Sequence, residues 1–162
     1  MQYLIEGIDA VGKSTLIKFM QKRIGYRVLK GSSFEQSETD NEGLYSNFFN
    51  LYLENDVIFD RSHISNLVYA SIFKDYSILS EEQVAHLEHL INHKSRLIYL
   101  YASPNFIKNR LDQRGDEYID NSAVRSILDK YEEAIGKSTL NIRKINVEGK
   151  STEEIFNEAF SY

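Results

Sequence analysis

The chain has 162 residues, of which 42% are hydrophobic and 27% charged, and its formal net charge is −5. This size suits one domain with its own core, and the ordinary charged fraction excludes a disordered or low-complexity protein. The absence of cysteine excludes a disulfide framework and a thiolate metal site. No signal-peptide pattern and no apolar run of membrane-spanning length occur, so we expect a cytoplasmic protein without membrane contact.

Short apolar runs alternate with amphipathic segments along the whole chain. In the first amphipathic segment Leu16, Phe19, Met20 and Ile24 follow the spacing of one helical face. This alternation predicts an α/β domain in which helices cover both faces of an about five-stranded parallel sheet. We find no internal repeat and no linker, so residues 1–162 are predicted to form a single domain. The predicted strands are residues 3–6, 27–30, 57–59, 96–102 and 142–147, and the predicted helices are residues 13–24, 38–55, 62–73, 80–93, 104–114, 121–135 and 151–160.

The segment from Gly7 to Thr15 matches G-x4-G-K-[ST], the pattern of a phosphate-binding loop. Glycines let backbone N–H groups turn inward toward phosphate oxygens, and the following helix adds its positive N-terminal end. The Lys13 ammonium can bridge the β- and γ-phosphates of ATP, and the Ser14 hydroxyl can bind Mg²⁺. The position between a strand and an amphipathic helix favours this interpretation over a glycine-rich turn. The residues expected to bind ATP are Gly7, Asp9, Ala10, Val11, Gly12, Lys13, Ser14 and Thr15.

Two aspartates are candidates for the acceptor side of the reaction. Asp9, inside the loop, is either a turn-favouring residue or a carboxylate that accepts a hydrogen bond from a sugar hydroxyl. Asp60 ends an apolar strand, and ligands of open parallel sheets bind at the carboxyl ends of the strands. There its carboxylate can bind Mg²⁺ or take a proton from the attacking oxygen. Arg61 follows directly and has the forked geometry that suits a phosphate, although an exposed Asp-Arg pair at a strand end is the alternative.

These two segments resemble a known family. The loop from Gly7 to Thr15 is similar to the thymidylate kinase form of the P-loop, which often carries aspartate at the third position. Residues 60–69, D-R-S-H-I-S-N-L-V-Y, are similar to the D-R-Y-x-x-S-x-x-A-Y segment of that family, and Ser62 follows the E-R-S form of the related deoxynucleoside kinases. The resemblance implies a three-layer, nucleoside monophosphate kinase-like fold, a deoxynucleotide acceptor and a homodimer.

The same resemblance assigns roles to individual residues. Arg61 would hold the acceptor phosphate, Asp60 would act as base or Mg²⁺ ligand, and Asp9 would lie near the sugar 3′-hydroxyl. Ser65 and Tyr69 of the same segment would contact the substrate. The chain also departs from the family pattern. Ala70 stands where the family has a glutamine that binds the base. The family also has an arginine after the second strand that binds the acceptor phosphate, but this chain has no arginine between residues 27 and 61. Only Lys30 or Gln36 could take its place.

A short lid is predicted around residues 110–120. Arg110 and Arg114 lie four residues apart on one helix, where their like charges repel unless an anion lies between them. Gly115 follows as a hinge, from which a segment with Tyr118 could close over the nucleotide. The alternative is a solvated helix end whose basic residues interact favourably with the helix dipole. The residues predicted to be catalytic are Lys13, Asp60, Arg61, Arg110 and Arg114.

Aromatic residues precede the Asp60 strand. Phe48, Phe49 and Tyr52 have the spacing of core residues, but in the resembling families an aromatic from this region stacks on the acceptor base. Phe48 is therefore also a substrate-binding candidate, and Phe34 is another. His86, His89 and His93 share a helical face with Glu82, but apolar residues occupy the opposite face, so we expect these histidines to face water and not a metal.

The leading hypothesis is an ATP- and Mg²⁺-dependent kinase of a deoxynucleoside monophosphate, with dTMP or a 5-substituted dUMP as acceptor. The second hypothesis keeps the fold and changes the acceptor to a deoxynucleoside or to a modified base in DNA. It is based on Ser62 and on the missing arginine, which the family places after the second strand. DNA is the less favoured partner, since polynucleotide-binding surfaces are normally basic. The third hypothesis is a non-catalytic nucleotide-binding protein.

Overall fold

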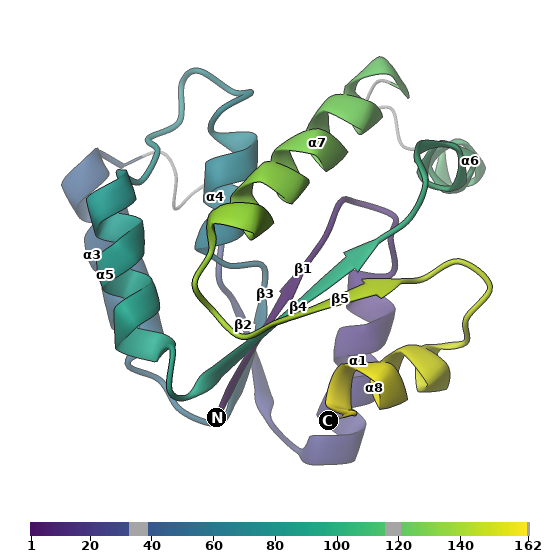
Figure 1. The fold of residues 1–162 in the computed structure, drawn as a ribbon, viewed down its shortest axis with the longest axis horizontal. Helices are drawn as coiled ribbons and strands as arrows, with labels where there is room; N and C mark the ends of the chain where they lie inside the picture. Colours follow the sequence, from purple (N-terminus) through teal and green to yellow (C-terminus); the bar gives the residue numbers. More distant parts are fainter. Residues whose placement is uncertain (33–38, 116–120, 162) are drawn as a thin grey trace.

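In the computed structural model, which describes residues 1–32, 39–115 and 121–161, five strands form one parallel sheet (Figure 1). The order across the sheet is β2-β3-β1-β4-β5. The central strands are apolar on both faces, because helices bury both, and this explains why they appear in the sequence as continuous apolar runs. The strands are β1 (Gln2–Glu6), β2 (Arg27–Lys30), β3 (Val57–Asp60), β4 (Ser95–Tyr101) and β5 (Ile142–Asn146).

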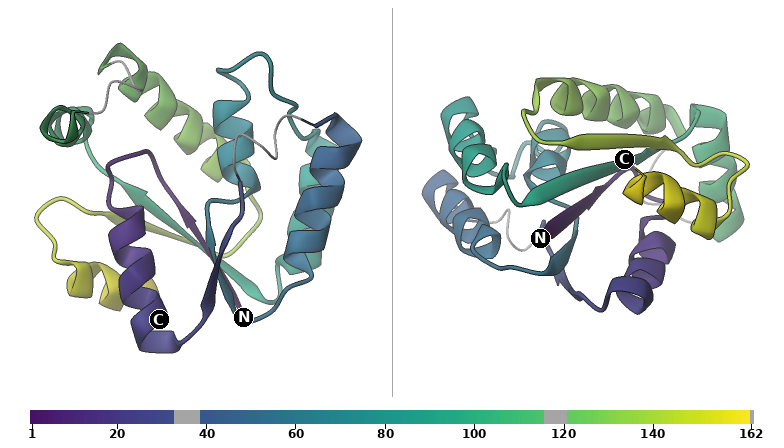
Figure 2. Two further views of the ribbon diagram at one scale, coloured as in Figure 1. Left: turned by 180° about the vertical axis from the view of Figure 1, so that it is seen from behind. Right: turned by 60° about the horizontal axis from the view of Figure 1, so that its bottom comes forward.

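The helices complete a three-layer α/β fold, as predicted. Helices α1 and α8 cover one face of the sheet, and α4 and α7 pack together on the other (Figures 1 and 2). Helix α3 packs against α5 beside the sheet. No helix among the described residues is long and apolar enough to cross a membrane. The helices are α1 (Lys13–Ile24), α3 (Asn41–Tyr52), α4 (His63–Tyr69), α5 (Glu81–Ile91), α6 (Pro104–Arg114), α7 (Asn121–Lys137) and α8 (Thr152–Phe160).

Most element boundaries lie within two residues of the prediction, and two helices are shorter. Helix α3 begins later than predicted because Asp40 caps it by accepting a hydrogen bond from the Gly43 N–H. Helix α4 ends at Tyr69 and not at residue 73, since hydrogen bonds of turns replace the helical ones from there on. The Asn66 side chain then holds the returning chain, with its amide donating to the Ser77 carbonyl (2.9 Å) and accepting from the Leu79 N–H (3.1 Å).

The strand order brings two chain segments together at one edge of the sheet. Strand β1 pairs with β3 so that Ile5 lies opposite Asp60, and the Arg61 N–H donates to the Ile5 carbonyl (3.0 Å). The phosphate-binding loop after β1 and the Asp60-Arg61 turn after β3 are therefore neighbours. Gly31 follows β2 at the same edge, where a Cβ atom would lie 2.0 Å from the Arg61 carbonyl oxygen. Only glycine fits this approach of two backbones.

Candidate active site

The loop from Gly7 to Thr15 has the backbone that anion binding requires. Gly7, Ala10 and Gly12 all have positive φ angles, of 147°, 68° and 109°. A Cβ atom on Gly7 would lie 2.5 Å from the Leu100 carbonyl oxygen, so the loop passes directly over β4. Gly12 gives α1 no side-chain cap. The first N–H groups of α1 are therefore left for a bound anion.

Lys13 is folded back onto this loop. Its side chain is only 7% exposed, and its Nζ donates to the carbonyl oxygens of Gly7 (2.9 Å) and Ile8 (3.4 Å). Burial, and secondarily the positive charge of Arg61, lowers the pKa of Lys13 from 10.5 to about 8. Nearby carboxylates, of which Asp9 has the largest effect, act in the opposite direction. A buried ammonium of this kind gains strongly from a polyphosphate anion.

A cavity of about 400 Å³ lies above the loop and has the composition of a phosphate site. Arg110 reaches it from α6 and donates to the carbonyl oxygens of Ala10 (3.1 Å) and Val11 (3.2 Å). The Arg110 guanidinium also lies 4.5 Å above the Phe106 ring. The structure thus brings the two predicted lid arginines to the phosphate-binding loop. The lining residues are Asp9, Ala10, Gly12, Lys13, Ser14, Thr15, Arg110, Gln113 and Arg114.

Arg61 occupies the centre of the site in a strained conformation. Its φ angle is 70°, which is uncommon for a residue with a side chain. Its guanidinium donates to Asp9 Oδ1 (2.5 Å), Ser65 Oγ (3.1 Å) and the Tyr131 hydroxyl (3.0 Å), and it lies 5.1 Å from the centre of the Tyr69 ring. The side chain of Arg61 is 17% exposed and that of Asp9 is 50% exposed. The contacts to Ser65 and Tyr131 are therefore the enclosed ones.

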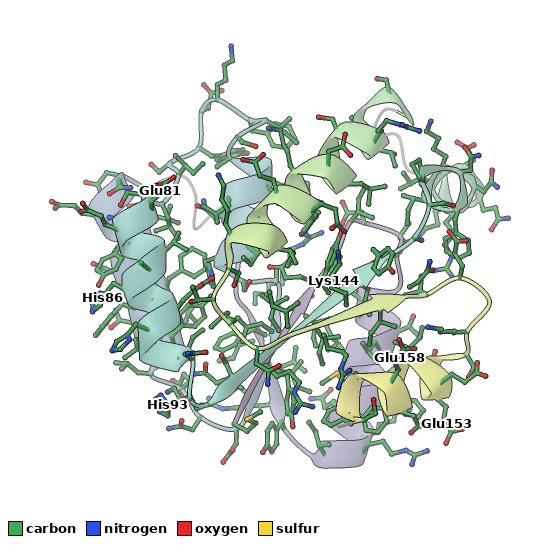
Figure 3. All side chains as sticks on the ribbon, in the orientation of Figure 1. Glu81, His86, His93, Lys144, Glu153 and Glu158 are labelled. Carbon is green, nitrogen blue, oxygen red and sulfur yellow. The ribbon has the colours of Figure 1, made fainter. Side chains whose placement is uncertain are left out.

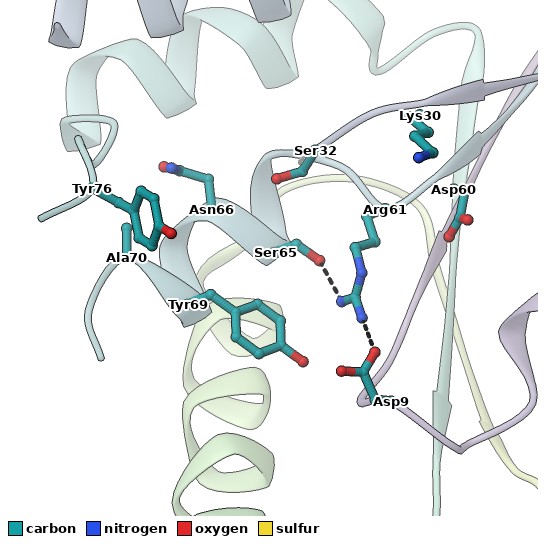
Figure 4. A pocket seen from close by; sticks show the side chains of 10 residues that line it. All are labelled: Asp9, Lys30, Ser32, Asp60, Arg61, Ser65, Asn66, Tyr69, Ala70 and Tyr76. Carbon is teal, nitrogen blue, oxygen red and sulfur yellow. Dashed lines mark hydrogen bonds and ion pairs between the residues drawn. The ribbon is translucent and has the colours of Figure 1, made fainter. Parts of the chain in front are cut away.

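A second cavity, of about 270 Å³, opens on the other side of Asp9 (Figure 4). Asp60 lines it with a carboxylate that has no hydrogen-bond partner among the residues described. Tyr69 also lines it, but its hydroxyl is buried. Burial raises the pKa of Tyr69, and the neighbouring Arg61 and Tyr131 act in the opposite direction. Figure 4 shows Tyr76 and Ala70 at one end of this cavity and Lys30 and Asp60 at the other. The lining residues are Asp9, Lys30, Ser32, Asp60, Arg61, Ser65, Asn66, Tyr69, Ala70 and Tyr76.

Two buried residues that the sequence interpretation missed support Arg61. Glu6 is fully buried, and its carboxylate accepts hydrogen bonds from the N–H and hydroxyl groups of both Ser62 and Ser65, at 2.7 to 3.1 Å. Tyr131 of α7 donates to Glu6 Oε2 or to the Gly7 carbonyl, each at 3.2 Å. Glu6 carries the signal that identified Asp60, an acid at the end of an apolar strand. Tyr131 has no such signal.

A second buried polar chain lies behind α4. The Tyr52 hydroxyl contacts His63 Nδ1 (2.6 Å), and His63 Nε2 contacts Glu88 Oε1 (3.1 Å). Burial alone would raise the pKa of Glu88, but hydrogen bonds from His63, Ser138 and Thr139 outweigh it and lower the pKa to about 2. This chain ties α3, α4 and α5 together beneath the acceptor side of the site.

The remaining predicted residues lie elsewhere. Phe48 is 1% exposed and packs against Tyr52 and His63, so it belongs to the core and does not reach the cavity. Phe34 and Tyr118 lie outside the described residues. His86 of α5 and His93, which follows α5, are exposed as expected (Figure 3). His86 also hydrogen-bonds the Tyr45 hydroxyl and stacks on the rings of Tyr45 and Phe49. Among the described residues, no group of three or more acidic or histidine side chains could hold a metal.

The parallel sheet, the phosphate-binding loop and the two adjoining cavities define a P-loop kinase of the nucleoside and nucleotide class. The chain belongs to the deoxynucleoside kinase family, whose sequence pattern it matches over residues 44–160. That stretch includes the segment from Asp60 to Tyr69. The family confirms the deoxynucleoside kinase part of the predicted resemblance, while the thymidylate kinase part stays a prediction.

One relative is similar over almost the whole chain. The SPbeta prophage-derived uncharacterized protein YorR of Bacillus subtilis is 43% identical over 152 residues, which are 94% of this chain and 92% of YorR. A crystal structure of YorR in complex with phosphorylated GDP superposes with a TM-score of 0.92 at 42% identity, covering 96% of this chain and 91% of that one.

Two more distant structures share the fold. Deoxyadenosine kinase from M. mycoides with bound dCTP superposes with a TM-score of 0.61 at 18% identity, covering 96% of this chain and 95% of that one. A gluconokinase from Sinorhizobium meliloti superposes with a TM-score of 0.63 at 13% identity, covering 98% of this chain and 88% of that one.

Proposed function

We propose that the protein transfers the γ-phosphoryl group of ATP to the 5′-hydroxyl of a deoxynucleoside. The observation that carries this proposal is the position of Asp9, which lines both cavities. A nucleoside triphosphate on the phosphate-binding loop and an acceptor beside Asp60 would then meet at this residue. Such an arrangement would place the two reactants next to each other, and positioning of this kind is the main contribution of a kinase to phosphoryl transfer.

The charges around the acceptor cavity favour an uncharged acceptor. The cavity is lined by two carboxylates, Asp9 and Asp60, and by two cations, Lys30 and Arg61. Arg61 donates to Asp9, Ser65 and Tyr131, whereas Lys30 makes no such contact with the residues that the structure describes. A dianionic phosphate beside Asp60 would meet more repulsion than a nucleoside hydroxyl.

The side chains divide the work of the transfer. The 5′-oxygen forms a bond to the γ-phosphorus as the bond to the β–γ bridging oxygen breaks, and Asp60 accepts the hydroxyl proton. Lys13 and Arg110, released from the loop carbonyls that they contact here, stabilise the charge on the transferring group. The Tyr69 ring would contact the acceptor, and Asp9 would accept a hydrogen bond from a sugar hydroxyl.

Ser14 would hold Mg²⁺ directly and Asp60 would hold it through a water molecule, which leaves the Asp60 carboxylate free to act as the base. Both offer oxygen atoms at the phosphate edge of the sheet, and Ser14 is exposed to the cavity above the loop. Mg²⁺ commonly binds through one or two protein oxygens together with water and substrate phosphates, which fits so small a donor set. When bound, the ion would neutralise charge on the β- and γ-phosphates.

The deoxynucleoside monophosphates dTMP and 5-substituted dUMP are the second candidate acceptors. Lys30 favours them, because it is an exposed cation beside Asp60 at the mouth of the cavity and could bind an acceptor phosphate. The complex of YorR with phosphorylated GDP supports the binding of a nucleotide in one of the two cavities and makes GTP a donor worth testing.

The direct test is a product assay with γ-labelled ATP or GTP and a panel of deoxynucleosides and their 5′-monophosphates. We expect a labelled deoxynucleoside 5′-monophosphate, and no product from Lys13→Ala or Asp60→Asn. Lys18→Ala, an exposed lysine on the same helix, is the matched control and should keep activity. Labelled diphosphates alone would favour the second candidate. Nucleotide binding without any transfer would contradict both and leave a binding protein.

A further inference from the structure

Tyr131 joins three parts of the active site through one hydroxyl group. This hydroxyl accepts a hydrogen bond from Arg61 Nη1 (3.0 Å), lies 3.1 Å from Ser65 Oγ, and donates to Glu6 Oε2 or the Gly7 carbonyl, each at 3.2 Å. Tyr131 is fully buried and lines neither cavity. It therefore contacts the site from behind and cannot touch a substrate.

Arg61 requires such support. Its φ angle of 70° directs the side chain back across the phosphate-binding loop, and a strained conformation persists only where its surroundings hold it. The contact with half-exposed Asp9 lies on the side where the substrates would enter and can be exchanged for a substrate oxygen. The contacts with Ser65 and Tyr131 lie on the enclosed side and remain when a substrate binds.

We propose that Tyr131 is a positioning residue that holds the Arg61 guanidinium between the donor and acceptor cavities. The inference rests on the proposed function, in which donor and acceptor meet at Asp9, the residue that the Arg61 guanidinium contacts. Its physical basis is that a hydrogen bond from a charged donor to a buried acceptor is stronger than one between neutral groups. Tyr131 belongs to α7, which also packs against α6, the helix that carries Arg110. Helix α7 therefore contacts Arg61 through Tyr131 and packs against the helix that carries Arg110.

The ring of Tyr131 has a separate packing role that can be kept while the hydroxyl is removed. The ring stacks on Tyr99, with centroids 5.4 Å apart, and meets Tyr69 edge to face at 6.1 Å. Tyr131→Phe preserves both contacts. Tyr99→Phe is the matched control, because it removes a hydroxyl from the stacked partner on β4. Among the described residues, Tyr99 has no contact with Arg61.

The test is a double-mutant cycle on the acceptor that the product assay identifies. We expect Tyr131→Phe to lower kcat roughly tenfold with little change in the KM for the acceptor, because Arg61 loses orientation while both cavities stay intact. In an Arg61→Lys background, the same substitution should change kcat less than about twofold, since the group that it positions is gone. Equal losses in the two backgrounds would overturn the inference.

A measurement without substrate separates this inference from the proposed function. Arginine side-chain NMR of the unliganded protein, with Arg61→Lys used to assign the Arg61 Nε–H signal, reports directly on its orientation. We expect Tyr131→Phe to shift or broaden that signal and Tyr99→Phe to leave it unchanged. An unaltered Arg61 signal in Tyr131→Phe contradicts the inference whatever the acceptor is, whereas failure of the product assay contradicts only the proposed function.

Discussion

Burial of the Lys13 ammonium makes the stability of the protein depend on pH. Burial and the charge of Arg61 lower the pKa of Lys13 to about 8 in the folded state, against 10.5 for the ordinary side chain. Between these two values the unfolded chain keeps a proton that the folded protein has lost, so the free energy of unfolding rises with pH. From about pH 7.5 to about pH 9.5 these two pKa values give a gain of about 2 kcal/mol.

Urea unfolding at three pH values across this window measures the effect. Lys13→Met removes the titrating group and keeps the apolar stem, so its free energy of unfolding should not rise over the window. Lys18→Met, a change at an exposed position of the same helix, should keep the wild-type rise. A wild-type protein that loses stability over this window, or a Lys13→Met variant that still shows the rise, would refute the reasoning.

Three further predictions concern the supports of the site. Gly31→Ala places a Cβ atom 2.0 Å from the Arg61 carbonyl oxygen and should destabilise the fold by about 3 kcal/mol, so an unchanged urea midpoint would contradict the close approach. Glu6→Gln turns an amide N–H toward buried donors and should cost about 2 kcal/mol or more by thermal unfolding, while a neutral effect would show that the carboxylate is not needed. Glu88, with its folded pKa lowered to about 2, stabilises the protein above its ordinary pKa of 4.5, and this contribution is lost as the pH falls through 2. Acid unfolding should therefore show a loss of about 2 to 3 kcal/mol that Glu88→Gln lacks.

The fold and the donor side of the site could be predicted from the sequence because their signals are local. Continuous apolar runs identify strands that are buried on both faces, and the spacing from Gly7 to Thr15 identifies the loop between β1 and α1. Asp60 was found for the same reason, since an acid at the end of an apolar strand must lie at the carboxyl edge of the sheet. Each of these features needs only a few neighbouring residues to be recognised.

Glu6 shows the same local signal as Asp60, but the support of Arg61 by Tyr131 could not be predicted in this way, because it depends on the distance between remote parts of the chain. Tyr131 lies 70 residues after Arg61 in the sequence, and only the packing of α4 against α7 brings them together. The sequence pattern around Phe48 is local but allows two interpretations. Its helical spacing is compatible with the core and with a pocket wall, and the packing of α3 against α5 and α4 places it in the core.

The most direct test of the central claim is a competition between a deoxynucleoside and its own 5′-monophosphate for a limiting amount of γ-labelled ATP. The ratio of the two kcat/KM values compares the acceptors in one reaction, with the same enzyme and donor. Because Asp60 and Asp9 line the acceptor cavity and Ser65 and Tyr131 keep hold of Arg61 when a substrate binds, we predict that the deoxynucleoside is preferred about a hundredfold or more. A preference for the monophosphate would contradict the account.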